Sequence, residues 1–259
     1  MVFRLSIFKY FLRFLLYNVV MDEKIFERVE KKYLISGKQK KALLSTIRKN
    51  MEKDDYFKSG IMNIYFDTDN YDLVIKSIDN PDFKEKVRAR SYDGYDKVFL
   101  EIKTKLKECG NRVGHKRRFL ISHSDFKELT SGKKTAVELA SRKIETNSDI
   151  QIAKEIDYIL NYFDLKPKIL IYYKRESYVG ENSLRITFDE NLTYRNDNLS
   201  FVKKASDKRF FKDEKNIIME VKTMGGMPLW LVSLLSKNKI YPVRFSKIGK
   251  IYELIRKEK

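Results

Sequence analysis

Basic side chains recur at every second position along segments of this sequence whose alternate residues are apolar. The clearest case is segment 86–105, KVRARSYDGYDKVFLEIKTK, where Arg88 and Arg90 alternate with Val87 and Ala89. Successive side chains of a strand point to opposite faces, so the two arginines share one face of a predicted strand. Guanidinium groups match phosphate oxygens in a two-pronged geometry. This face therefore predicts a site for a phosphate-bearing anion.

Several further segments carry charged residues at the same spacing. One such strand alone would ordinarily be a solvated face of a half-buried sheet. Repetition weakens that interpretation, because one sheet rarely needs so many cationic ladders to remain soluble. The other charged positions, in chain order, are Arg28, Glu30, Lys32, Glu101, Lys103, Lys116, Arg118, Arg175, Arg185, Asp189, Glu220 and Lys222.

The elements that must position these residues can be read from periodicity and caps. Ser36 and Gln39 form a capping box that predicts a helix over 37–51, and Ser148 with Gln151 predicts a second helix start. Asp67 is expected to cap the turn that follows it. Alternation predicts strands at 26–35, 61–67, both arms of 86–105, 116–121, 168–178, 183–189 and 216–222. Further helices are expected at 125–130, at 229–235 and in the tail after 247.

The two faces of these strands need different surroundings. The apolar faces must pack under helices, and the charged faces cannot also form a dry core because unpaired buried charge is too costly. We therefore predict an α+β fold, an antiparallel closed β-barrel tunnel of about eight strands with helices packed outside. Its acidic residues, Glu30, Glu101 and Glu220, would pair with lysines or hold a divalent cation. For Glu101 we favour pairing, with Lys103 or another lumen lysine.

Composition narrows the class of partner. The 259 residues hold 54 Lys and Arg against 36 Asp and Glu, a formal charge of +18. This balance favours a polyanion such as nucleic acid, an acidic membrane or a phosphate compound. Acidic residues inside the basic ladders argue against nucleic acid. One cysteine excludes an internal disulfide, two histidines disfavour a zinc site, and no Walker sequence is present.

Residues 1–20, MVFRLSIFKYFLRFLLYNVV, form an apolar and basic extension before the regular pattern. Arg4, Lys9 and Arg13 interrupt the apolar run, which leaves no stretch of the roughly 20 residues that span a bilayer. The extension is interpreted as lying upstream of a true start at Met21, or as a peripheral membrane anchor. The expected organisation is this extension followed by a single domain over 21–259, cytoplasmic and with peripheral membrane association or a membrane partner protein as an option.

Eight segments in order resemble a known family. They are FERVEKKYLI, IYFDT, KVRARSY, FLEIKTK, YKRESY, LRITFDENL, IMEVKT and FSK, spread over about residues 26–254. This set resembles the polyphosphate polymerase domain of the vacuolar transporter chaperone (VTC) family, among the triphosphate tunnel metalloenzymes. The resemblance implies a tunnel that binds ATP and a metal ion, Mn²⁺ or Mg²⁺. It also implies transfer of the terminal phosphate of ATP to a growing polyphosphate chain, with release of ADP.

The resemblance also implies roles for individual residues. Glu220 matches the metal-binding glutamate, and Arg28 replaces the first glutamate of the wider superfamily's E-x-E-x-K strand, which agrees with the polymerase branch. A triphosphatase of the same fold and a non-catalytic polyphosphate-binding module remain alternatives. The implied ATP- and phosphate-binding residues, catalytic except for Lys116, are Lys32, Arg88, Arg90, Lys103, Lys116, Arg175, Arg185 and Lys247.

The sequence generates a first test. Replacing Arg88 or Arg90 with Ala removes charge-assisted contacts to phosphate, each worth roughly 1.5–3 kcal/mol. Nucleotide affinity or turnover should fall in a steady-state assay, with little change in melting temperature. Normal turnover in the double variant would contradict the assignment.

Overall fold

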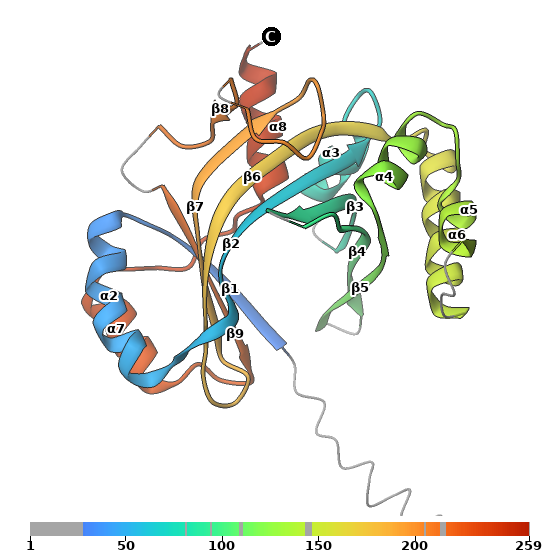
Figure 1. Ribbon diagram of the computed structural model, residues 1–259. Helices are drawn as coiled ribbons and strands as arrows, with labels where there is room; N and C mark the ends of the chain where they lie inside the picture. The colour runs from blue at the N-terminus through green and yellow to red at the C-terminus, as the bar shows by residue number, and fades with distance from the viewer. Residues whose placement is uncertain are drawn as a thin grey trace, which may run out of the picture.

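The computed structural model describes residues 28–80, 82–93, 95–108, 111–142, 147–204, 206–212 and 216–258. The predicted 1–20 extension lies outside these ranges. One curved antiparallel sheet dominates the fold (Figure 1). Its strands are β1 (Arg28–Ile35), β2 (Glu52–Asp67), β3 (Phe83–Tyr92), β4 (Val98–Glu108), β5 (Asn111–Ile121), β6 (Lys166–Val179), β7 (Arg185–Arg195), β8 (Lys208–Arg209) and β9 (Ile217–Met224).

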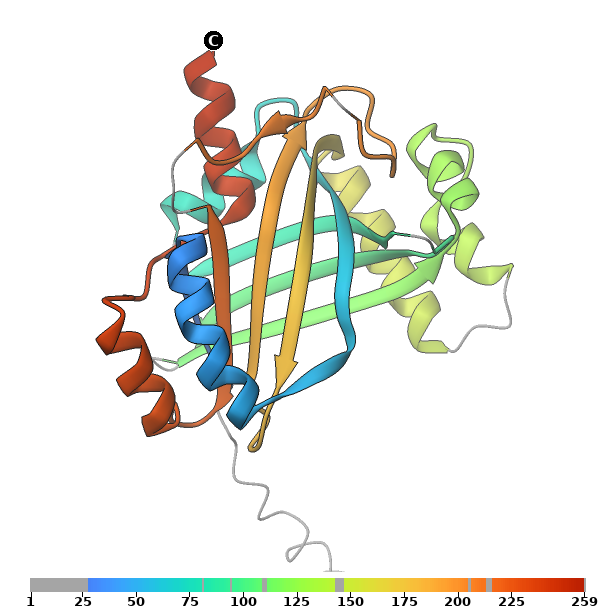
Figure 2. The ribbon, with the colours of Figure 1, turned by 60° about the vertical axis from the view of Figure 1, so that its left-hand side comes forward.

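The strands are ordered β1-β9-β7-β6-β2-β3-β4-β5, with β8 paired to β7. Figure 2 shows β3, β4 and β5 crossing behind β9, β7 and β6 at a steep angle, so the sheet folds over on itself. The predicted α+β antiparallel architecture is confirmed.

The predicted closure of the barrel is not confirmed. In the described part of the chain, the end strands β1 and β5 form no ladder with each other, so the sheet is open. The outer edge of β1 is instead engaged by the segment 243–247, where the Val243 N–H donates to the Lys32 carbonyl at 2.7 Å. Because that hydrogen-bonding position is taken, β5 cannot pair there.

Most of the described helices pack outside the sheet, as predicted, through two apolar clusters on its convex face. Helices α3 and α8 differ, because a third cluster joins them to the face that carries Tyr65 and Tyr173, and both helices line the cavity there. The helices α4, α5 and α6 gather beside β3–β5, while α2 and α7 lie against the opposite half (Figure 1). Their bounds are α2 (Gly37–Asn50), α3 (Asp72–Asp79), α4 (His123–Thr130), α5 (Ala136–Ser141), α6 (Asn147–Tyr162), α7 (Leu229–Lys237) and α8 (Lys247–Glu258). Among the helices described, none has the length and apolar character needed to cross a bilayer.

Local signals explain most of the element boundaries. The Ser36–Gln39 capping box at α2 is present, with both reciprocal hydrogen bonds. The helix predicted after Ser148 is confirmed as α6, which begins slightly earlier, at Asn147. Helix α5 was missed although Thr135 and Glu138 form a capping box of the same type. Strands β2 and β5 begin earlier than predicted, because cross-strand pairing extends them through polar sequence that lacks apolar alternation.

The predicted capping role of Asp67 is confirmed. Its carboxylate accepts backbone N–H groups from Thr68 at 2.9 Å, Leu73 at 2.9 Å and Val74 at 3.1 Å. Asp67 is only 4% exposed, so water cannot replace it as the acceptor at the first turn of α3.

Asp67→Ala should lower the free energy of unfolding by about 1–3 kcal/mol, because it leaves buried donors without an acceptor. Urea denaturation monitored by circular dichroism measures the change. Asp69→Ala is the matched control, since the Asp69 side chain is exposed and makes ion pairs with Lys166 and Lys168 at the surface. Equal stability of the two variants would contradict the capping assignment.

Candidate functional site

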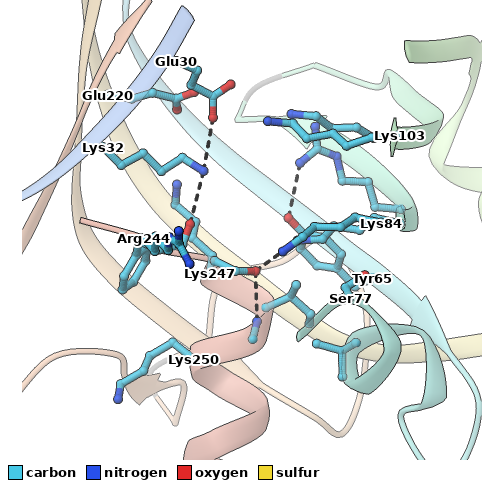
Figure 3. A pocket seen from close by; sticks show the side chains of 18 of the residues that line it. Glu30, Lys32, Tyr65, Ser77, Lys84, Lys103, Glu220, Arg244, Lys247 and Lys250 are labelled. Carbon is cyan, nitrogen blue, oxygen red and sulfur yellow. Dashed lines mark hydrogen bonds and ion pairs between the residues drawn. The ribbon is translucent and has the colours of Figure 1, made fainter. Parts of the chain in front are cut away.

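The concave face of the sheet encloses a cavity of about 1180 Å³. Basic side chains dominate its lining, with Glu30, Glu220 and Glu253 as its acidic members. Figure 3 shows Lys32, Lys103, Arg244 and Lys247 converging on this space from separate elements. The basic lining residues are Lys32, Lys84, Lys86, Arg88, Arg90, Lys103, Lys105, Lys116, Arg175, Lys222, Arg244, Lys247 and Lys250.

Strand register explains why these residues meet. Lys103 lies opposite Lys86 on β3 and opposite Lys116 on β5. Lys32 on β1 lies opposite Glu220 on β9. Since the period of two keeps every second residue on one face, the short charged ladders join into one continuous concave surface.

The structure brings together most of the residues singled out in the sequence. Lys32, Arg88, Arg90, Lys103, Lys116, Arg175, Lys247 and Glu220 all line the cavity. Arg185 is not among its lining residues, although it occupies the same face of β7. Its guanidinium instead bonds Asp54 at 2.5 Å and Ser177 at 3.1 Å. Arg185 stands at the start of its strand, opposite the cavity residue Lys222, and the shared face alone did not reveal its ion pair with Asp54.

Sequence reasoning missed several lining residues. Lys86 is the clearest, because it precedes Arg88 at the same spacing and therefore carried the same signal. Its Nζ donates to the Ser246 Oγ at 3.0 Å and so contacts the segment 243–247. Arg244 in that segment and Lys250 in α8 also line the cavity. Neither lies in a strand with alternating charge, so the pattern in the sequence did not indicate them.

Glu101 is fully buried beneath one wall of the cavity. The expected pairing with a lumen lysine is confirmed for Lys116, whose Nζ lies 3.6 Å from the Glu101 Oε1, but Arg88 is the nearer partner. The Arg88 Nε and Nη2 atoms lie 2.7 and 2.6 Å from the Glu101 Oε2. Arg88 faces Glu101 directly in the register, which makes it the nearer cation. Burial raises the pKa of Glu101, but Arg88, Arg90 and Lys116 outweigh burial and bring it to about 2.

This pairing revises the first test. Arg88→Ala would leave the buried Glu101 charge without its main partner, so a fall in melting temperature is now expected for that variant. Arg90 bonds the neutral Asn63 Oδ1 at 2.8 Å, and Arg90→Ala is therefore the cleaner probe of phosphate contact.

Three groups in the cavity titrate near neutral pH. Burial lowers the pKa of Lys86 to about 8, with Lys32, Lys103 and Arg88 adding to the effect. Burial also brings the pKa of Lys103 to about 8, against the opposing attraction of Glu30. Burial raises the pKa of Tyr65, but Arg88 and Lys86 outweigh it and lower the value to about 8. The positive charge of the cavity must therefore decrease as pH rises through about 8.

Two carboxylates in the cavity suit a hard cation. Glu30 and Glu220 lie near one another on adjacent strands (Figure 3). Burial raises the pKa of Glu220, but Lys222, Lys32, Lys247 and Arg175 together hold it well below its ordinary value, so the group is anionic. Mg²⁺ and similar ions commonly take one or two carboxylates and complete their shell with substrate phosphates. Within the described residues, no group of three or more His, Cys, Asp or Glu side chains could hold a metal ion.

Binding of inorganic tripolyphosphate should show the titration of the lysines. At pH 8–9 the anion favours protonated Lys103, so the wild type should take up protons on binding. Its affinity should fall relative to a Lys103→Arg variant as pH rises, by up to about tenfold per pH unit for this group.

Calorimetry in buffers of different ionisation enthalpy measures both quantities. Lys103→Arg is the matched control because arginine stays protonated, and proton exchange by the ligand itself cancels between the two proteins. Identical proton uptake and identical pH dependence in both proteins would contradict a lowered pKa at Lys103.

One of the solved structures compared supports this architecture. HpAC1 from Hippeastrum, provisionally assigned as an adenylyl cyclase and described as having a dominant triphosphatase activity, aligns with a TM-score of 0.50 at 15% identity. The alignment covers 86% of this chain and 93% of that one. The PH1819 protein of Pyrococcus horikoshii aligns over 87% of this chain and 98% of its own, at 15% identity and a TM-score of 0.46. At these identities the likeness concerns the fold alone.

Sequence comparison identifies the family. Vacuolar transporter chaperone complex subunit 4 of Schizosaccharomyces pombe is 27% identical over 148 residues, which are 52% of this chain and 20% of that protein. The chain thus spans only a part of this curated relative. The profile of the VTC domain matches residues 27–255, nearly the whole chain. The protein therefore belongs to the VTC domain family.

Proposed function

We propose that this protein is a polyphosphate polymerase, which transfers the γ-phosphate of ATP to a growing inorganic polyphosphate chain and releases ADP. The observation that carries the proposal is the cavity, whose basic residues come from both halves of one folded sheet. Membership of the VTC family supports the choice of substrate. ATP and polyphosphate are thus the proposed ligands, and nucleic acid is not.

The geometry suits phosphoryl transfer without a covalent intermediate. Such transfer depends mainly on in-line positioning and neutralisation of phosphate charge. Arg88, Arg90 and Lys103 lie on one half of the sheet, while Lys32 and Arg175 lie on the other. A triphosphate held between these halves would be contacted from two sides, and an acceptor phosphate could align with its terminal group. Lys86 and Lys247 extend the same surface along the cavity.

A divalent cation fits the proposed site. Glu220 would hold Mn²⁺ or Mg²⁺ together with Glu30, and substrate phosphate oxygens would complete the coordination. When bound, the ion would neutralise charge on the phosphate oxygens during transfer. Both carboxylates already contact lysines, Glu30 with Lys32 and Glu220 with Lys222, each at 3.2 Å.

A triphosphatase is the second candidate, because the same cavity could bind triphosphate with water as acceptor. The described activity of the Hippeastrum protein, which shares the fold, favours keeping this alternative. A non-catalytic polyphosphate-binding module is the third. For the setting in the cell, we propose cytoplasmic location with peripheral membrane association, since the curated relative is a subunit of a transporter chaperone complex.

The products distinguish the candidates. Purified protein incubated with γ-labelled ATP and Mn²⁺ or Mg²⁺ should yield ADP and a ladder of labelled phosphate chains on a gel. Orthophosphate alone with both metals would replace the polymerase with the triphosphatase. Polyphosphate binding without turnover would establish the binding module.

Glu220→Gln tests the metal assignment. It keeps the shape of the side chain but removes its charge, so it should lower turnover far more than nucleotide affinity. Stopped-time ADP release and calorimetric nucleotide binding measure the two effects. Glu253→Gln is the matched control, since Glu253 lines the cavity from α8 and makes an exposed pair with Lys250. Equal turnover in the two variants would contradict a metal role for Glu220.

A further inference from the structure

A fully buried carboxylate also stands behind the wall opposite Arg88. The Asp189 side chain accepts from the Arg175 Nε at 2.6 Å and from its Nη2 at 2.8 Å. The Lys247 Nζ donates to the same group at 2.6 Å. Asp189 therefore holds two cavity cations that arrive on separate elements, β6 and the first residue of α8.

On the opposite side of the cavity, Arg88 is held in the same way by a different buried carboxylate, Glu101. Glu101, like Asp189, has no exposed surface and engages the Nε–Nη2 edge of its arginine. Each arginine also lies over a cavity tyrosine, Arg88 at 5.9 Å from the Tyr65 ring centroid and Arg175 at 5.4 Å from that of Tyr173. Each guanidinium is thus fixed from behind by a carboxylate and from one side by an aromatic ring.

We propose that Glu101 and Asp189 are positioning residues, which fix the direction in which Arg88 and Arg175 present their remaining N–H groups to a phosphate chain. In Arg88 the Nη1 also donates to the Tyr65 hydroxyl at 3.3 Å, so this tyrosine helps to hold the same orientation. The inference rests on the proposed function, because it gives these carboxylates a part in phosphoryl transfer. Neither carboxylate lines the cavity, so neither touches the anion. Both carboxylates repel a bound anion. If electrostatics were their only effect, removing either charge would strengthen anion binding.

This electrostatic effect distinguishes a positioning role from a role in anion binding or in stability alone. Asp189→Asn and Glu101→Gln add net positive charge beside the cavity but leave each arginine free to turn. Positioning predicts that affinity for inorganic tripolyphosphate is kept or rises while kcat for ATP falls at least about tenfold. It also predicts a loss of selectivity for tripolyphosphate over sulfate, because an unfixed guanidinium no longer matches one spacing of phosphate groups.

Asp207→Asn is the structural control. Asp207 accepts from Arg195 at 2.8 Å, both side chains are buried, and neither lines the cavity. This variant should lower the melting temperature but leave kcat per folded molecule and anion selectivity unchanged.

The experiment measures kcat, melting temperature and the ratio of tripolyphosphate to sulfate affinity for the wild type and the three variants. A lower kcat together with a lower selectivity ratio in Asp189→Asn and Glu101→Gln would support positioning. Unchanged kcat with tighter binding of both anions would overturn it, and so would a loss of activity proportional to the loss of folded protein. If the wild type binds tripolyphosphate but does not turn over ATP, the proposed function fails, and the selectivity ratio still decides whether the carboxylates position the arginines.

Discussion

Repulsion among like charges is the constraint on which this structure depends. Basic side chains from most strands of the sheet face a single cavity, where burial removes much of the water that would screen them. Buried carboxylates beneath the surface offset part of that repulsion, and two large apolar clusters lie on the other face of the sheet. Repulsion in the anion-free cavity lowers the stability of the fold. Burial of the apolar clusters under the outer helices must therefore compensate for it.

The same repulsion explains why arginines and lysines of the cavity differ in how firmly they keep their charge. Groups that stay charged, such as Arg88 and Arg175, sit directly on carboxylates and keep their protons at any physiological pH. Lysines farther from a carboxylate, such as Lys86 and Lys103, give up part of their charge when no anion is present. The cavity thus combines fixed and adjustable charge, and a bound polyanion would restore the adjustable part.

Alternation in the sequence was sufficient to place the concave residues on one face, since it depends only on the geometry of a strand. Arg88, Arg90, Lys103 and Lys32 were predicted correctly to meet for that reason. Register and edge pairing depend on contacts between distant segments. The main partner of Glu101, the ion pair of Arg185 with Asp54 and the contact of segment 243–247 with the edge of β1 could therefore not be predicted. Lys86 could have been, because it continued a pattern already recognised.

The contact of β1 with the segment 243–247 has a consequence for how the chain is made. The Lys32 Nζ donates to the Phe245 carbonyl, a contact between residues 213 positions apart in the sequence. The strand that pairs with β1, β9, is likewise distant in the sequence. Contacts of such separation form late and slow the folding of a domain. During synthesis, β1 has neither of these partners until residues 217–245 have left the ribosome. The half of the cationic surface that β1 and β9 carry is therefore completed after the half carried by β3, β4 and β5, which pair with one another earlier in the chain.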